Sequence, residues 1–446
     1  MSGLRWAEAK QPSARTSLVE PLAGYLLLLT VFAGVVSVVW WADAAVVAGV
    51  AVWSAAALLW KGTGLRTRRN AVLLCAVGAI TVSLAWGLGV PVPWRDLVIT
   101  NAALIGLLAA VTFLSLVARP DTDLEELPKG DRAIASTLAT VHLFGAVINM
   151  SAMFIVADQI QQRNRLTPVQ MAAIARAFAT AITWSPFFAA MGMALTYAPG
   201  ADLRTLVGFG LPVAMAGMLY TYWETRERQG ARPFVGFPVS YRSLGLPAVL
   251  ALAVLALHAA FPAYSVVSIV TATAPVAGVL ALLIRHRQSG APILRRHVTH
   301  RLPQMRGELL LFVAAGVLSV GLRALIEASP IGLPIDRFGA NEACVLLVVM
   351  VALSGLGIHP IVNVACFGSL LAPLGADPGL LGLTFLTSWG LGVVINPLSG
   401  VNLSMRARYR TGRLTLVALN FRYLLVMLLT TMAVLQGYGL WWLAPQ

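Results

Sequence analysis

The chain has 446 residues, of which 58% are hydrophobic and only 11% are charged, and its mean hydropathy is +0.80. A soluble chain of this length would form about three domains, but no polar stretch here is long enough to separate them. The net charge of +14 lies in short loops between apolar runs, as the positive-inside rule describes for membrane proteins. These features predict an all-α polytopic membrane protein and argue against a nucleic-acid-binding surface.

About 11–13 apolar segments are long enough to cross a bilayer, or to enter it and return. Residues 1–20 are polar and basic, without a cleavable signal peptide, and are expected to be cytoplasmic. The basic stretch from Arg285 to Arg306 is expected to be a cytoplasmic loop. The apolar segments in chain order are Pro21–Trp41, Asp43–Trp60, Ala71–Val90, Leu97–Val117, Arg132–Ala157, Thr167–Tyr197, Thr205–Trp223, Leu244–Pro262, Tyr264–Ile284, Leu309–Ala328, Ala343–Ala372, the segment containing Asn396, and Leu414–Gln436.

Two of these segments contain a proline that should break the helix at membrane depth, Pro186 and Pro397. Proline removes a backbone donor and clashes with the preceding turn. Unpaired backbone groups cost several kcal/mol each, roughly, in hydrocarbon, so such breaks occur only where protein or a water-filled cavity surrounds them. A pair of broken helices, one in each half of a chain, is the best sequence indication of a transporter's binding site.

Polar side chains beside the breaks are therefore candidate ligands for a substrate or an ion. The alternative is that they only cap helix ends, as Asn and Ser also do in soluble proteins. The candidates are Asn149, Ser151, Thr183, Ser185, His359, Asn363, Asn396, Ser399 and Asn402. Arg176 is a possible contact for an anion, although its side chain could instead extend to the membrane interface.

The titratable residues and the cysteines indicate which coupling ion, metal and substrate charge to expect. His359 could carry a coupled proton, because the unperturbed pKa of histidine is about 6.5; a neutral, hydrogen-bonded histidine is the equal alternative. Carboxylates are scarce in the apolar segments, and the three cysteines have no metal-ligand spacing. We therefore expect no metal site and no other cofactor. Half-helix N-termini would suit an anionic substrate.

The chain divides into two membrane halves, residues 21–230 and 231–446. Each contains a core repeat, residues 97–223 and 308–437, with the same order of unbroken and broken segments. Pro186 and Pro397 are 211 positions apart, and Gly145 and Gly355 are 210 apart. Arginines precede the last segment of the second repeat but follow that of the first. By the positive-inside rule, this reversal predicts that the two repeats have opposite orientations.

With Thr183-Trp-Ser185-Pro186, Gly357-Ile-His359-Pro360 and Asn396-Pro397, the two repeats resemble the ion transporter superfamily of bacterial carriers for citrate, dicarboxylates, arsenite and sodium ions. The resemblance implies a re-entrant hairpin and a discontinuous helix in each repeat, an elevator-like arrangement of two domains, and often a homodimer. The paired Ser-Asn-Thr signature that many of these carriers have at the breaks is absent here.

Together these features predict a secondary transporter for a small carboxylate-type anion in the bacterial inner membrane, coupled to H⁺ or Na⁺. An exporter or exchanger of another small solute is the alternative. A polytopic transferase using His359 is disfavoured by the short loops, and no paired acid–base motif indicates an enzyme. The lipid bilayer and the substrate are the expected partners, with no nucleic acid.

Overall fold

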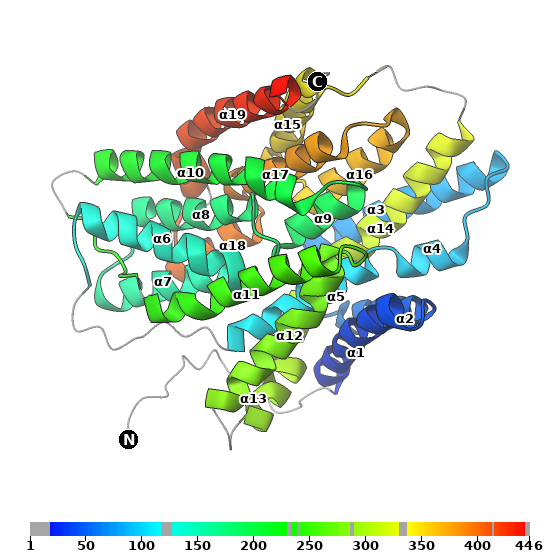
Figure 1. Ribbon diagram of the computed structural model, residues 1–446, viewed down its shortest axis with the longest axis horizontal. Helices are drawn as coiled ribbons and strands as arrows, with labels where there is room; N and C mark the ends of the chain where they lie inside the picture. Colours follow the sequence, from blue (N-terminus) through cyan, green and yellow to red (C-terminus); the bar gives the residue numbers. More distant parts are fainter. Residues whose placement is uncertain are drawn as a thin grey trace.

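The computed structural model describes residues 18–116, 127–229, 233–239, 241–285, 290–329, 337–412 and 414–441, and these residues are almost entirely helical (Figure 1). One isolated β-bridge, between Lys129 and Val235, is the only β pairing among them. The α-helices are α1 Val19–Val39, α2 Ala44–Leu59, α3 Leu65–Gly87, α4 Trp94–Ile99, α5 Ala102–Thr112, α6 Asp131–Ile148, α7 Met150–Arg163, α8 Pro168–Ile182, α9 Ala189–Tyr197, α10 Leu203–Arg228, α11 Tyr241–Ala260, α12 Val266–Arg285, α13 Gly290–Arg296, α14 Arg306–Ala328, α15 Ala340–Gly355, α16 Pro360–Leu371, α17 Pro378–Ile395, α18 Gly400–Tyr409 and α19 Thr415–Trp441. Shorter helical turns are η1 Phe113–Leu116, η2 His297–Arg301, η3 Leu302–Met305 and η4 Ala372–Leu374.

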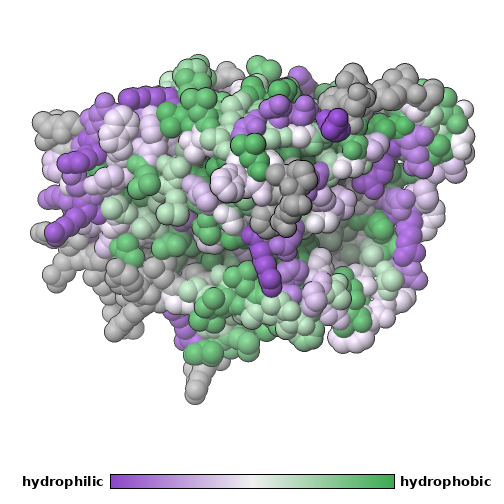
Figure 2. All heavy atoms as spheres, turned by 45° about the horizontal axis from the view of Figure 1, so that its top comes forward, coloured by the Kyte–Doolittle hydropathy of each residue, from purple (hydrophilic) through white to green (hydrophobic). Residues whose placement is uncertain are grey.

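In the described part of the chain, eight helical stretches are long and apolar enough to cross a membrane, and five shorter apolar helices accompany them. Figure 2 shows hydrophobic residues over much of the middle of one face, with hydrophilic residues gathered toward its left and right edges. Helices α6, α8 and α10 lie side by side in the left part of Figure 1. The expected all-α polytopic membrane fold is confirmed. The eight long stretches are Val19–Val39, Leu65–Gly87, Trp94–Leu116, Leu203–Arg228, Val266–Arg285, Gly290–Ala328, Pro378–Tyr409 and Thr415–Trp441.

Each core repeat has the same order of helices. The first contains α5, α6, α7, α8, α9 and α10, and the second contains α14, α15, α16, α17, α18 and α19. Corresponding helices pack against each other across the two units, α8 against α17 and α10 against α19. Figure 1 shows α6, α7, α8 and α10 on the left, α15 and α19 at the top, and α1, α2 and α12 at the bottom.

The expected segment Arg132–Ala157 forms two helices, α6 and α7, which pack against each other. One residue separates them, Asn149, whose φ of 58° produces a sharp change of direction. Residues 234–236 connect the starts of α6 and α8. Gly130 N–H, before α6, donates to Phe234 O, and Gln170 Nε2, in the first turn of α8, donates to Val235 O. The pair is a helical hairpin; that it enters the membrane and returns on the same side, as the family resemblance implies, stays a prediction.

The second repeat has a hairpin of the same kind, α15 and α16. Its first end, at Asn341, accepts a hydrogen bond from Gln436 near the end of α19. Asp377, which follows the hairpin, accepts one from Tyr438 of the same helix. Asp131 and Arg226 form the corresponding ion pair in the first repeat, at 2.8 Å. Asn341 and Gln436 lie 210 positions after these two residues, so a tertiary contact recurs at the offset that the sequence gives for the repeats.

Two segments differ from expectation. The stretch from Arg285 to Arg306 is not an open loop where it is described, because α13, η2 and η3 lead directly into α14. The segment Leu97–Val117 is interrupted at Asn101, which has a φ of 62° and lies between α4 and α5. Asn101 Nδ2 donates to Phe312 O and Asn101 Oδ1 accepts from Tyr197, so neighbouring helices satisfy this break. Tertiary partners, which no local pattern reveals, permit both features.

Labelling of introduced cysteines tests the prediction that the two repeats have opposite orientations. In a chain whose Cys75, Cys344 and Cys366 are replaced by alanine, Arg204→Cys should react with a membrane-impermeant thiol reagent from outside the cell. Ala407→Cys should react only after permeabilisation, because positive loops stay inside. Both positions are exposed in the structure. Labelling of both from the same side would contradict the inverted arrangement.

Candidate functional site

A cavity of about 470 Å³ lies between the two repeats, and four helices begin at its wall. They are α7, α9, α16 and α18, the second halves of the two hairpins and of the two broken helices. Each contributes its N-cap residue and its first two residues to the lining: Asn149, Met150 and Ser151; Phe188, Ala189 and Ala190; His359, Pro360 and Ile361; and Ser399, Gly400 and Val401. The positive ends of four helix dipoles therefore converge on one volume.

These N-termini also present unpaired backbone donors. Side chains cap part of the ends: Asn149 accepts from Met150 N–H, His359 from Ile361 N–H and Ser399 from Asn402 N–H. The first two N–H groups of α9 and of α18 have no acceptor among the described residues. Free N–H groups at a helix start favour anions. The cavity thus combines positive dipole ends with open donors.

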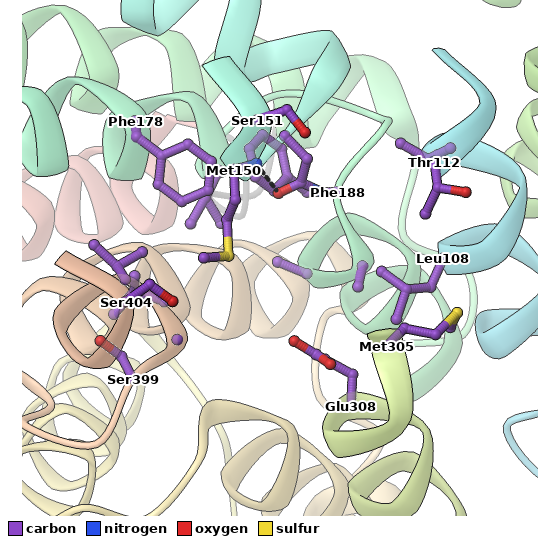
Figure 3. Close-up of a pocket in the computed structure, with 18 of the residues that line it drawn as sticks. Leu108, Thr112, Met150, Ser151, Phe178, Phe188, Met305, Glu308, Ser399 and Ser404 are labelled. Atoms are coloured by element: carbon purple, nitrogen blue, oxygen red, sulfur yellow. Dashed lines mark hydrogen bonds between the residues drawn. The ribbon is translucent and has the colours of Figure 1, made fainter. Parts of the chain in front are cut away.

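Charged side chains lie at the same cavity. Arg301, of η2, donates to Gln304 Oε1 at 2.8 Å and to Ser151 Oγ at 3.3 Å, and has no acidic partner among the described residues. Arg408, of α18, is paired with Asp158 of α7 through two hydrogen bonds. Glu308, of α14, also lines the cavity, and Figure 3 shows its carboxylate pointing into the space between α14 and the side chains of Ser399 and Ser404.

The remaining wall is mostly apolar and aromatic. Phe178 and Phe188 pack edge to face, with ring centroids 5.4 Å apart, and Figure 3 places both near Met150 at the tip of the first hairpin. Trp389 packs edge to face on His359, with ring centroids 6.1 Å apart. Phe312 also lines the cavity. Such a lining suits a small ligand with an apolar body and few charged groups.

Four of the nine candidate residues line the cavity: Asn149, Ser151, His359 and Ser399. Asn149 and His359 are equivalent, because they cap the second hairpin helix of each repeat and lie 210 positions apart. The Nδ1 atom of His359 accepts a backbone N–H, so in this geometry the ring is a neutral cap. The role of His359 as a proton carrier stays a prediction, and protonation at Nδ1 would break the cap.

The other five candidates lie behind the cavity and bind the backbone of the breaks. Asn396 Nδ2 donates to Ile358 O at 3.0 Å, and its Oδ1 accepts from Leu398 N–H at 2.8 Å. Ser185 Oγ donates to Ala146 O, and Thr183 Oγ1 donates to Gly210 O. The remaining two are also buried and donate to backbone carbonyls, Asn363 to Met350 and Asn402 to Val394. These side chains therefore bind backbone groups near the site and do not face the cavity themselves.

Arg176 is not at the cavity but in a buried ion pair with Glu224 of α10. Its Nε donates to Asn420 Oδ1 at 2.8 Å, its Nη2 donates to Leu419 O, and its guanidinium lies 4.7 Å from the ring centroid of Tyr423. All of these partners belong to α10 and α19. The side chain therefore neither extends to the membrane interface nor faces the cavity.

Sequence reasoning missed Arg301 and Glu308 as cavity residues. Arg301 lies in the stretch that the sequence analysis interpreted as a loop. Glu308 lies just before the predicted segment Leu309–Ala328, so it was not considered a residue of the membrane interior. The available signal was the break in periodicity at Pro303, which is where η2 and η3 turn the chain toward α14. Its direction could not be deduced from the sequence.

Asn396→Ala is expected to destabilise the folded protein by about 1–3 kcal/mol, because it removes the part-buried hydrogen bonds of this amide to the Ile358 carbonyl and the Leu398 N–H. Thermal unfolding of the purified protein in detergent measures the effect. Ser83→Ala, which removes an exposed hydroxyl bonded within α3, is the matched control and should unfold like the wild type. An unchanged transition for Asn396→Ala would show that the break holds its shape without this amide.

No protein-family model matches the chain, and no curated protein matches it. Among solved structures, the crystal structure of the YdaH transporter of Alcanivorax borkumensis is similar, with 17% sequence identity and a TM-score of 0.38. The similarity covers 96% of this chain and 88% of the other. That structure is described as having an unusual topology.

Proposed function

We propose that the protein is a secondary transporter of a small organic anion, of the carboxylate type, coupled to H⁺ or Na⁺. The observation that carries the proposal is the convergence of four helix N-termini on one cavity between two repeats of the same plan. Broken helices whose N-termini point at a site between repeats are the arrangement by which secondary transporters hold anionic groups.

The charge and the lining of the cavity support an anionic substrate. Arg301 lacks an acidic partner among the described residues, and open backbone donors lie across the cavity from it. No group of three or more His, Cys, Asp or Glu side chains in the described residues could hold a metal ion. A carboxylate on an apolar or aromatic body would pair with Arg301 and the helix starts, while Phe178, Phe188 and Trp389 contact the body.

Localisation and assembly follow from the same proposal. The protein would lie in the inner membrane of a bacterium with residues 1–20 in the cytoplasm, and a homodimer is the assembly that the family resemblance suggests. An exporter or exchanger of another solute would use the same cavity in the opposite direction.

Reconstitution tests the proposal. Purified protein in lipid vesicles should accumulate at least one of radiolabelled benzoate, succinate and citrate when a proton or sodium gradient is imposed, and empty vesicles should not. Exchange of internal unlabelled anion for external label should also occur without a gradient. Failure of all three anions in both assays, with correctly folded protein, would refute the anion carrier.

A further inference from the structure

Glu308 differs from the paired charges of the cavity because its carboxylate has no ion pair and no hydrogen bond to another residue among the described residues; it accepts only from its own backbone N–H. It lies two residues into α14, beside Met305 and Phe312 in the cavity wall. Figure 3 shows its carboxylate directed into the cavity, facing the start of α18. An unpaired carboxylate in apolar surroundings at the substrate site is a candidate for a functional role in a membrane protein.

Other charges near α14 do not compensate it. Its neighbour Arg306 is paired with Glu20 of α1, at 3.4 Å. The elements packed against α14 are α2, α3, α4, α5, α16 and η3. The charged or titratable side chains of these elements do not line the cavity. They are Arg66, Arg68, Arg69 and Cys75 of α3, Arg95 and Asp96 of α4, and Cys366 of α16.

The titratable side chains that line the cavity with Glu308 come from other elements. They are Arg301, His359, and Arg408, which is paired with Asp158.

The formal charges of the empty cavity therefore balance. Arg301 offsets Glu308, Arg408 offsets Asp158, and His359 is neutral while its Nδ1 accepts a hydrogen bond. A monoanion entering this site would bring one uncompensated negative charge into a mostly apolar cavity. Protonation of Glu308 removes one negative charge, so that the positive charge of Arg301 then balances that of the bound anion.

We infer that Glu308 is the proton carrier of this transporter, taking up one proton when the anion binds. This inference rests on the proposed anion transport and deepens it. The anion and one proton enter from the same side, the proton converts the carboxylate of Glu308 to the carboxylic acid, and both leave on the other side. For a monoanion, the step moves no net charge.

The binding of sodium benzoate, succinate and citrate to purified protein, measured by isothermal titration at several pH values, tests this role. Wild-type affinity should fall by about tenfold for each pH unit above the pKa of the carboxyl, because the proton-bound form binds the anion better. Glu308→Gln imitates the protonated acid, so its affinity should be high and independent of pH. In vesicles, Glu308→Gln should still exchange anion but should no longer accumulate it from a pH gradient.

Glu327→Gln is the matched control, since it makes the same change on the exposed far end of α14, and it should keep the wild-type pH profile. Anion binding by the wild type that does not change with pH, or a Glu308→Gln variant with the wild-type slope, would overturn the role of Glu308 while leaving anion transport in place. Anion binding that requires Na⁺ and does not change with pH would also overturn the role of Glu308 and leave anion transport in place. Lack of binding of all three anions by the wild type would overturn both proposals. The wild-type profile decides the matter even if Glu308→Gln does not fold.

Discussion

Glu224→Ala should lower the stability of the folded protein by about 3–5 kcal/mol, the typical effect of removing one partner from a buried ion pair. The side chain of Glu224 has no exposed surface and that of Arg176 is 3% exposed. Glu224 also pairs with Arg228, at 3.0 Å. Without the carboxylate, the guanidinium of Arg176 would stay buried between α8, α10 and α19 with no charge to balance it.

Unfolding of the purified protein by heat or denaturant measures this effect. Glu227→Ala is the matched control, because the pair of Glu227 with Arg422 is half exposed, and exposed pairs contribute about 0–1 kcal/mol. Replacing Arg176 and Glu224 together by methionine should recover most of the loss, since it removes both buried charges. A Glu224→Ala variant as stable as the Glu227→Ala variant would show that Arg176 is hydrated or finds another partner.

The contrast between Arg176 and the helix breaks shows what the sequence can reveal. Pro186 and Pro397 act on their own backbone, so the ends of α8 and α17 could be predicted from local chemistry alone. The burial of Arg176 depends on Glu224, 48 positions later, and on Asn420, 244 positions later. Apolar periodicity places such residues in a membrane segment but does not reveal their partners.

The candidate site divides in the same way. The sequence identified the polar residues of the breaks, and the structure separates them into those at the cavity, such as His359, and those behind it, such as Asn396. This separation depends on which side of each helix start faces the other repeat. Arg301 and Glu308 escaped prediction because the path of η2 and η3 is set by packing against α1 and α5, and sequence spacing carries no record of it.

Arg301→Ala should weaken anion binding by about 1.5–3 kcal/mol, the contribution of a hydrogen bond to a charged group, which is roughly a 10- to 150-fold increase in the dissociation constant. Arg301 is the cavity cation without an acidic partner among the described residues, so an entering carboxylate does not have to displace one. Titration of the purified protein with the anions that the wild type binds measures the change.

The identity of the group matters as well as its charge. Arg301→Lys should give an intermediate affinity, because the ammonium keeps the charge but loses the planar fork that binds a carboxylate through two hydrogen bonds. Arg296→Ala, on the exposed side of α13 and outside the cavity, is the matched control and should bind like the wild type. Equal losses in Arg301→Ala and Arg296→Ala would indicate that the basic stretch attracts anions only by its general field, which added salt would screen. A loss confined to Arg301 that persists at high salt would indicate direct pairing within the cavity.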